Sequence, residues 1–199
     1  MPTSVDDAQD LAWVRLVQSH DDRTAFAHLV CRHQGRVRAV LCRLTGGHQA
    51  LADELAQDTF LRAYHALAEF RGESRFRTWL YRIAYNVFLQ HHRRGSQRLE
   101  ALRQSVEEDD DETLHGSDGG AQSAGLELNL DLQHALDQLS DDEREAIIHC
   151  YFADLSHSEA AEVLGWPLGT VKTHVLRAKA KLKTSLHAWN PSLATEDIA

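Results

Sequence analysis

The sequence predicts an all-α protein of two small helical domains, an N-terminal helical bundle and a C-terminal helix-turn-helix, joined by a flexible acidic linker. Apolar residues recur at the 3.6-residue spacing of helices along most of the chain, and strand-like alternation is weak. A run of six acids at residues 107–112, followed by glycine and serine, interrupts this pattern. The 199 residues are enough for two domains of this kind.

The first domain is expected over residues 8–95, with helices at about 8–18, 26–44, 49–68 and 76–94. Gly46 and Gly47 end the second helix, and the sequence FRGES separates the third from the fourth. The faces expected to be buried in the last three helices are Phe26, Val30, His33, Val37, Leu41 and Leu44; Ala52, Leu55, Thr59, Ala63 and Leu67; and Phe76, Trp79, Leu80, Ile83 and Val87. The fourth helix should expose its arginines.

Residues 96–127 are expected to form the linker. Its central sequence VEEDDDETLHGSDGGAQSAG combines consecutive acids with glycine and serine, a composition that cannot bury a core. Two interpretations stay open for the acidic run. It is either a solvated tether, or an anionic segment that mimics nucleic acid in the basic channel of a partner.

The second domain is expected over residues 128–187, and its helix boundaries are well marked. Ser140 with Glu143, and Ser156 with Glu159, each form the pattern of a capping box at a helix start. Gly165 ends the short second helix, and Pro167 suits the first turn of the next. A short helix, a tight turn and a basic helix together indicate a helix-turn-helix.

The last helix carries five cations and no acid between Gly169 and Ser185. A helical wheel places Val171, Val175, Ala178 and Leu182 in one stripe, which should face the domain core. The opposite face should then present a narrow edge flanked by cations, which suits a DNA major groove with phosphates on both sides. A solvated lysine-rich helix without a ligand is the alternative.

Charge is distributed unevenly along the chain, although its formal total is −9. Residues 71–98 hold seven arginines and one acid, and residues 105–168 hold seventeen acids and one base. Two basic segments separated by an acidic one predict two contacts with a polyanion, so the negative total does not argue against a nucleic acid.

Several classes of protein are disfavoured. No apolar run approaches the roughly 20 residues of a membrane span, and the N-terminal MPTSVDDAQDL lacks the apolar segment of a signal peptide, so we expect a cytoplasmic protein without membrane insertion. Cys31, Cys42 and Cys150 lack CxxC spacing. A zinc site using His28, His33 or His149 is a weaker reading than three cysteines packed as small hydrophobes, so no metal or other cofactor is expected.

An enzyme is also disfavoured, because the chain contains no nucleophile elbow, phosphate-binding glycine loop or HExxH. No catalytic residues and no small-molecule substrate are therefore expected. A stand-alone helix-turn-helix regulator with an N-terminal sensor domain stays open as an alternative. It would account for GTVKTHVLRAK but would leave FRGES and TWLYRIAYN without a role.

Two stretches resemble bacterial RNA polymerase sigma factors of the extracytoplasmic-function (ECF) group of the sigma-70 family. They are ADELAQDTFLRAYHALAEFRGESRFRTWLYRIAYN at residues 52–86 and LSHSEAAEVLGWPLGTVKTHVLRAKAKL at 155–182. The resemblance covers about residues 10–95 and 128–186. It implies that the chain binds core RNA polymerase (the β′ clamp helices and β flap) and promoter DNA, and that an anti-sigma factor restrains it. It also favours a linker that threads through a polymerase channel.

The resemblance further implies roles for three groups of residues. Docking on the β′ clamp helices is implied for Asp53, Glu54, Gln57 and Asp58. Capture of a flipped −10 base, with phosphate contacts to the separated strand, is implied for Phe70, Arg71, Gly72, Glu73, Ser74, Arg75, Arg77, Arg82, Asn86, Arg93 and Arg94. Reading of the −35 element is implied for Lys172, Thr173, Leu176 and Arg177. The helical wheel adds flanking positions on both sides of this face, which are Thr170, His174, Lys179 and Lys181. His174 departs from the arginine common at that position, which weakens the −35 contact or makes it pH-dependent.

Overall fold

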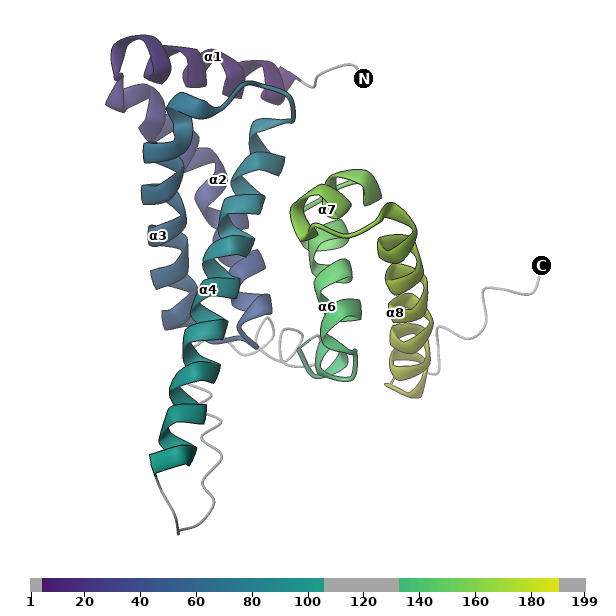
Figure 1. Cartoon of the computed structure of the whole chain (residues 1–199). Coiled ribbons are helices and arrows are strands. Elements are labelled where there is room, and N and C mark those ends of the chain that lie inside the picture. The colour runs from purple at the N-terminus through teal and green to yellow at the C-terminus, as the bar shows by residue number, and fades with distance from the viewer. Residues whose placement is uncertain (1–4, 106–132, 190–199) are drawn as a thin grey trace, which may run out of the picture. The chain divides into compact units, whose positions relative to one another are not determined.

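The computed structural model describes residues 5–105 and 133–189, and within these ranges every regular element is a helix (Figure 1). The chain divides into two compact units, each with its own core. The predicted all-α class is confirmed for the described part of the chain. None of the helices described there is both long enough and apolar enough to span a bilayer.

The first unit is a bundle of four helices, with a short 3₁₀ turn before the last. These elements are α1 (Val5–His20), α2 (Arg23–Leu44), α3 (Gln49–Ala66), η1 (Leu67–Glu69) and α4 (Phe76–Ser105). In Figure 1, α2, α3 and α4 run side by side, and α1 lies across one end of them. Because η1 contacts α1, the loop of residues 70–75, which follows η1, begins close to α1.

Local sequence explains where these helices begin and end. The Asp22 carboxylate accepts hydrogen bonds from the Thr24 and Ala25 amides and so caps α2. Gly46 and Gly47 have φ angles of 65° and 89°, which stop α2 as the sequence predicted. Helix α4 instead runs to Ser105, well past residue 96, where the linker was expected to begin. The acidic run at 107–112 lies outside the described residues.

The buried face of α2 differs from the predicted one. Ala25, Leu29 and Val40 are in the core, whereas Phe26, Val30 and His33 are only half-buried. The reason is that α2 packs against three helices, α1, α3 and α4. Its buried residues are therefore spread around the helix and do not form a single stripe. The predicted faces of α3 and α4 are buried apart from Ile83, which is half-buried.

The second unit packs α6 (Asp141–Ile147), η2 (Ile148–Phe152), α7 (His157–Leu164) and α8 (Leu168–Trp189) around Leu136, Ile148 and Val171. Both predicted capping boxes are present, at Ser140 and at Ser156. η2 is a π-type turn in which the Ala153 amide donates to the Ile148 carbonyl at 3.1 Å.

Candidate nucleic-acid interface

Helix α8 follows a three-residue turn, and the geometry of that turn fixes which face of α8 is exposed. Gly165 has φ of 70°, and the Trp166 amide donates to the Ala161 carbonyl, which ends α7 abruptly. The Pro167 carbonyl then accepts from the Thr170 and Val171 amides in the first turn of α8. The short α7 and the long basic α8 thus form the predicted helix-turn-helix.

The faces of α8 agree with the helical wheel. Val171, Val175 and Ala178 are buried, and Leu182 is half-buried. The outward face presents exposed Lys172, Thr173, Leu176 and Arg177. Leu176 is 71% exposed, which is unusual for a large apolar side chain, and it stands one turn from Thr173. The Thr173 hydroxyl donates to the Gly169 carbonyl at 2.8 Å, so its donor is used within the helix.

Two of the expected flanking cations contact other parts of the unit. The Lys181 ammonium donates to the buried carboxylate of Glu143 at 2.7 Å, and this contact holds the pKa of Glu143 below its usual value. This side chain therefore joins α8 to α6 while staying half exposed, and the −35 contact expected of Lys181 stays a prediction. Lys179 lies 5.8 Å from the centre of the Tyr151 ring and stays exposed.

His174 and Thr170 are half-buried, and neither belongs to the exposed face. The His174 ring packs 5.5 Å from Trp166, and its Nδ1 atom is buried without a hydrogen-bond partner. His174 therefore packs against the turn before α8, and the flanking DNA contact expected of it stays a prediction.

In the first unit, the loop of residues 70–75 exposes its central residues and buries its first. Arg71, Gly72 and Glu73 are exposed, and Gly72 has φ of 74°, which strongly favours glycine. The Phe70 ring is 7% exposed and packs on Trp79 and Phe76 at 5.1 and 6.0 Å. Phe70 thus anchors the loop through a buried ring, and its expected part in −10 capture stays a prediction. Trp79 is in the core, as predicted.

The polar residues expected at the −10 site follow this loop along α4. Arg82, Asn86 and Arg93 are exposed, and their spacing places them on one face of the helix. Arg94 is exposed next to that face. The loop residues Ser74 and Arg75, and Arg77 in the first turn of α4, are half-buried instead.

The expected docking face lies on α3, where Glu54 and Gln57 are exposed. Two arginines partly neutralise its aspartates. Arg38 of α2 donates to both carboxylate oxygens of Asp53 and holds the pKa of that carboxyl below its usual range, and Arg62 pairs with Asp58 at 2.9 Å. Leu61, 62% exposed, stands one turn beyond Asp58 and adds an apolar residue that the sequence reasoning did not single out.

In the part of the chain that the structure describes, the histidines and cysteines do not gather into a site. Within residues 5–105 and 133–189, no group of three or more His, Cys, Asp or Glu side chains has the arrangement of a metal site. His149 is fully buried and its Nδ1 donates to the Glu145 carbonyl, while burial raises the pKa of Cys150 to about 11. Cys31 is exposed, so the expectation that all three cysteines pack as hydrophobes is wrong for this one.

Comparison with known proteins decides the family. The Sigma-70 region 2 family matches residues 29–98, and the Sigma-70 region 4 family matches residues 129–182. The chain belongs to the sigma-70 family. Region 2 thus covers most of the bundle that carries the loop and α4, and region 4 covers the helix-turn-helix. Helix α1 lies outside both matches.

Individual relatives place this sigma factor in the ECF group. RNA polymerase sigma factor NccH of Alcaligenes xylosoxydans xylosoxydans is 36% identical over 84% of this chain and 89% of its own length. RNA polymerase sigma-H factor of Pseudomonas aeruginosa is 33% identical over 89% of this chain and 94% of its own. ECF RNA polymerase sigma factor SigE of Mycolicibacterium smegmatis is 34% identical over 79% and 60%.

Solved structures share the fold of this sigma factor. CnrH, in complex with the cytosolic domain of CnrY, is 29% identical with a TM-score of 0.67, over 90% of this chain and 98% of that one. The sigma factor RpoE of Bartonella quintana, in complex with the anti-sigma factor NepR, is 27% identical with a TM-score of 0.64, over 81% and 96%. The ECF resemblance expected from the sequence is confirmed.

Proposed function

We propose that this sigma factor binds core RNA polymerase and directs initiation at promoters whose −35 element is read by α8 and whose −10 element is opened and held by the loop of residues 70–75 and α4. The observation that carries the proposal is the acid-free face of α8. On that face, Lys172 and Arg177 flank exposed Leu176.

Reading of the −35 element follows from the chemistry of this face. Arg177 can hydrogen-bond a guanine through two donors, and Lys172 and Lys179 can contact phosphates. Leu176, with the methyl group of Thr173 one turn away, offers an apolar contact to the 5-methyl group of a thymine. We infer that the −35 element contains such a thymine.

Opening of the −10 element needs a favourable contact that offsets the free energy of unstacking a base. The exposed Asn86 carboxamide can both donate to and accept from the Watson–Crick edge of a flipped base. Arg82 and Arg93 lie on the same face of α4 and supply positive charge for the phosphates of the separated strand. Arg71, in the exposed loop, adds to this charge.

Docking on the polymerase is assigned to Glu54, Gln57 and Asp58, with exposed Leu61 as the apolar centre of the same face. Phosphodiester chemistry belongs to the polymerase, so the sigma factor has no catalytic residues of its own. It acts in the cytoplasm, where the polymerase and DNA are. Because the B. quintana sigma factor is complexed with an anti-sigma factor, an anti-sigma partner is proposed here as well.

Transcription with purified components tests the proposal. Core enzyme with and without this chain is supplied with fragments of bacterial DNA, and the start sites of the transcripts are mapped. Added chain should concentrate starts downstream of one shared pair of elements, and unchanged start sites would contradict the proposal. A gel shift of duplex promoter DNA with the chain alone tests the stand-alone regulator, which should bind without polymerase.

A further inference from the structure

The loop of residues 70–75 is held at its first residue by a side chain of α1. The Gln18 carboxamide donates to the Leu67 carbonyl and to the Phe70 carbonyl, each at 2.9 Å. The Phe70 amide also donates to the Leu67 carbonyl at 3.1 Å. Both hydrogens of one carboxamide thus hold the point where η1 ends and the loop begins.

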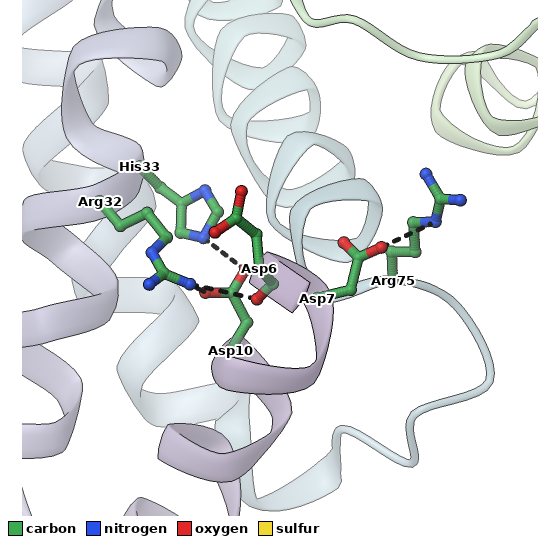
Figure 2. Close-up of polar contacts among 6 residues, drawn as sticks. All are labelled: Asp6, Asp7, Asp10, Arg32, His33 and Arg75. Carbon is green, nitrogen blue, oxygen red and sulfur yellow. Dashed lines mark hydrogen bonds and ion pairs between the residues drawn. The ribbon is translucent and has the colours of Figure 1, made fainter. Parts of the chain in front are cut away.

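The other end of the loop contacts the same helix, eleven residues earlier. Asp7 is 8% exposed, and its carboxylate lies 3.4 Å from Nε of Arg75, the last loop residue before α4 (Figure 2). Figure 2 shows the two terminal nitrogens of Arg75 pointing away from Asp7. The Arg75 carbonyl accepts from the Trp79 amide at 3.1 Å, so this residue also starts the hydrogen bonding of α4.

Helix α1 is itself firmly attached to α2. Asp10, 3% exposed, accepts from Arg32 and pairs with Nε2 of His33, each at 2.8 Å (Figure 2). Arg32 also donates to the Asp6 carbonyl at 3.1 Å and lies 4.3 Å from the centre of the Trp13 ring. Two buried carboxylates on one short helix are costly unless they are paired, and here each pair reaches a different element.

From these contacts we propose that α1 is a brace that positions the loop for −10 capture, with Gln18 and Asp7 as its two positioning residues. The inference rests on the proposed function of the loop. Eleven residues of helix span about 16 Å, so one rigid element sets both ends of the loop before DNA arrives. A loop ordered in advance loses less conformational entropy on binding, which leaves more of the contact energy for strand opening.

The test compares two α1 variants with matched controls in reconstituted holoenzyme on a mapped promoter. Gln18→Ala removes both carbonyl contacts, and Gln9→Ala removes an exposed amide from the same helix. Asp7→Asn removes the charge that faces Arg75, and Asp6→Asn removes an exposed charge next to it. Open complexes on duplex DNA should fall about tenfold for Gln18→Ala and about threefold for Asp7→Asn, with both controls unchanged.

Three further readouts separate positioning from a general structural role. Core affinity should stay at the wild-type value, the melting temperature of the chain should fall by only a few degrees, and a template with a premelted −10 region should remove most of the deficit. Normal opening by both variants would overturn the inference, as would equal losses of core affinity or no rescue by the premelted template. If the wild-type holoenzyme showed no start-site selectivity, the proposed function would be contradicted, and this inference would fail with it.

Discussion

In the proposed function, strand capture depends most directly on Asn86, because its exposed carboxamide follows the loop on the arginine-bearing face of α4. Asn86→Ala should leave core binding unchanged and lower open-complex formation about tenfold, since it removes hydrogen bonds made only to the flipped base. Permanganate reactivity of promoter thymines measures opening. Gln34→Ala, which removes an exposed amide from α2, is the control. Normal melting by Asn86→Ala would contradict the base-capture assignment.

The contact proposed between Leu176 and a thymine methyl group can be tested by changing the DNA as well as the protein. Replacing the thymine that it contacts by uracil removes one methyl group and should weaken holoenzyme binding about fourfold. Leu176→Ala should bind thymine and uracil promoters equally. Binding that ignores every thymine-to-uracil change in the −35 element, or a Leu176→Ala variant that still discriminates, would refute this contact.

The burial of His149 should make the stability of the second unit depend on pH. Burial lowers its pKa from 6.5 to about 4, so between these values the unfolded chain binds a proton that the folded unit does not. The free energy of unfolding should therefore be constant above about pH 6.5 and fall by about 2 kcal/mol at pH 5. Urea unfolding followed by circular dichroism at pH 7 and pH 5 measures the loss.

His149→Asn is the matched variant, because its amide can still donate to the Glu145 carbonyl but does not titrate. Its stability should change little between pH 7 and pH 5. An equal loss in the variant and the wild type would assign the effect to other groups. The carboxyl of Glu143 contributes only at lower pH, because the contact with Lys181 lowers its pKa below 4.5.

At the scale of elements, α3 is expected to carry polymerase docking. Gln57→Ala with Asp58→Ala should weaken core binding about tenfold, because both residues lie on the face that contains exposed Leu61. The double variant Asp6→Ala with Gln9→Ala removes the same two kinds of group from α1 and should bind normally. Fluorescence titration of labelled sigma factor with core enzyme gives both affinities, and equal affinities would refute the docking face.

Helix boundaries were predictable from the sequence where a local signal determines them. Ser140, Ser156 and Gly165 act through contacts within a few residues, and each ends or begins a helix as predicted. The end of α4 lacks such a signal, and the helix runs to Ser105, past the end expected at about residue 94. The buried face of α2 depends on three packing partners, which no spacing within α2 reveals.

The candidate site was predictable in its exposed residues and less so in its partnered ones. Lys172, Leu176 and Arg177 follow from helical spacing alone, whereas the pairing of Lys181 with Glu143 joins residues 38 positions apart. The burial of Asp7 and Asp10 could have been predicted from the sequence, because they continue the spacing of buried Val14 and Val17. Two acids within an apolar stripe indicate buried ion pairs, but their partners come from other helices.

At the scale of the whole chain, the formal charge of −9 coexists with two separate cationic surfaces, one in each unit. In the proposed function each surface reads only one part of the promoter, since α8 would bind duplex DNA and α4 would hold an opened strand. Their connection through one polypeptide raises the effective concentration of the second contact once the first has formed. Both surfaces are therefore expected to engage one DNA molecule.

Footprinting of wild-type holoenzyme on one mapped promoter tests this expectation most directly. The account predicts protected duplex at the −35 element together with permanganate-reactive thymines at the −10 element. Arg177→Ala should reduce the upstream protection, and Asn86→Ala should abolish the reactive thymines while that protection persists. Upstream protection without any opened strand in the wild type, or variants that leave both signals unchanged, would contradict the account.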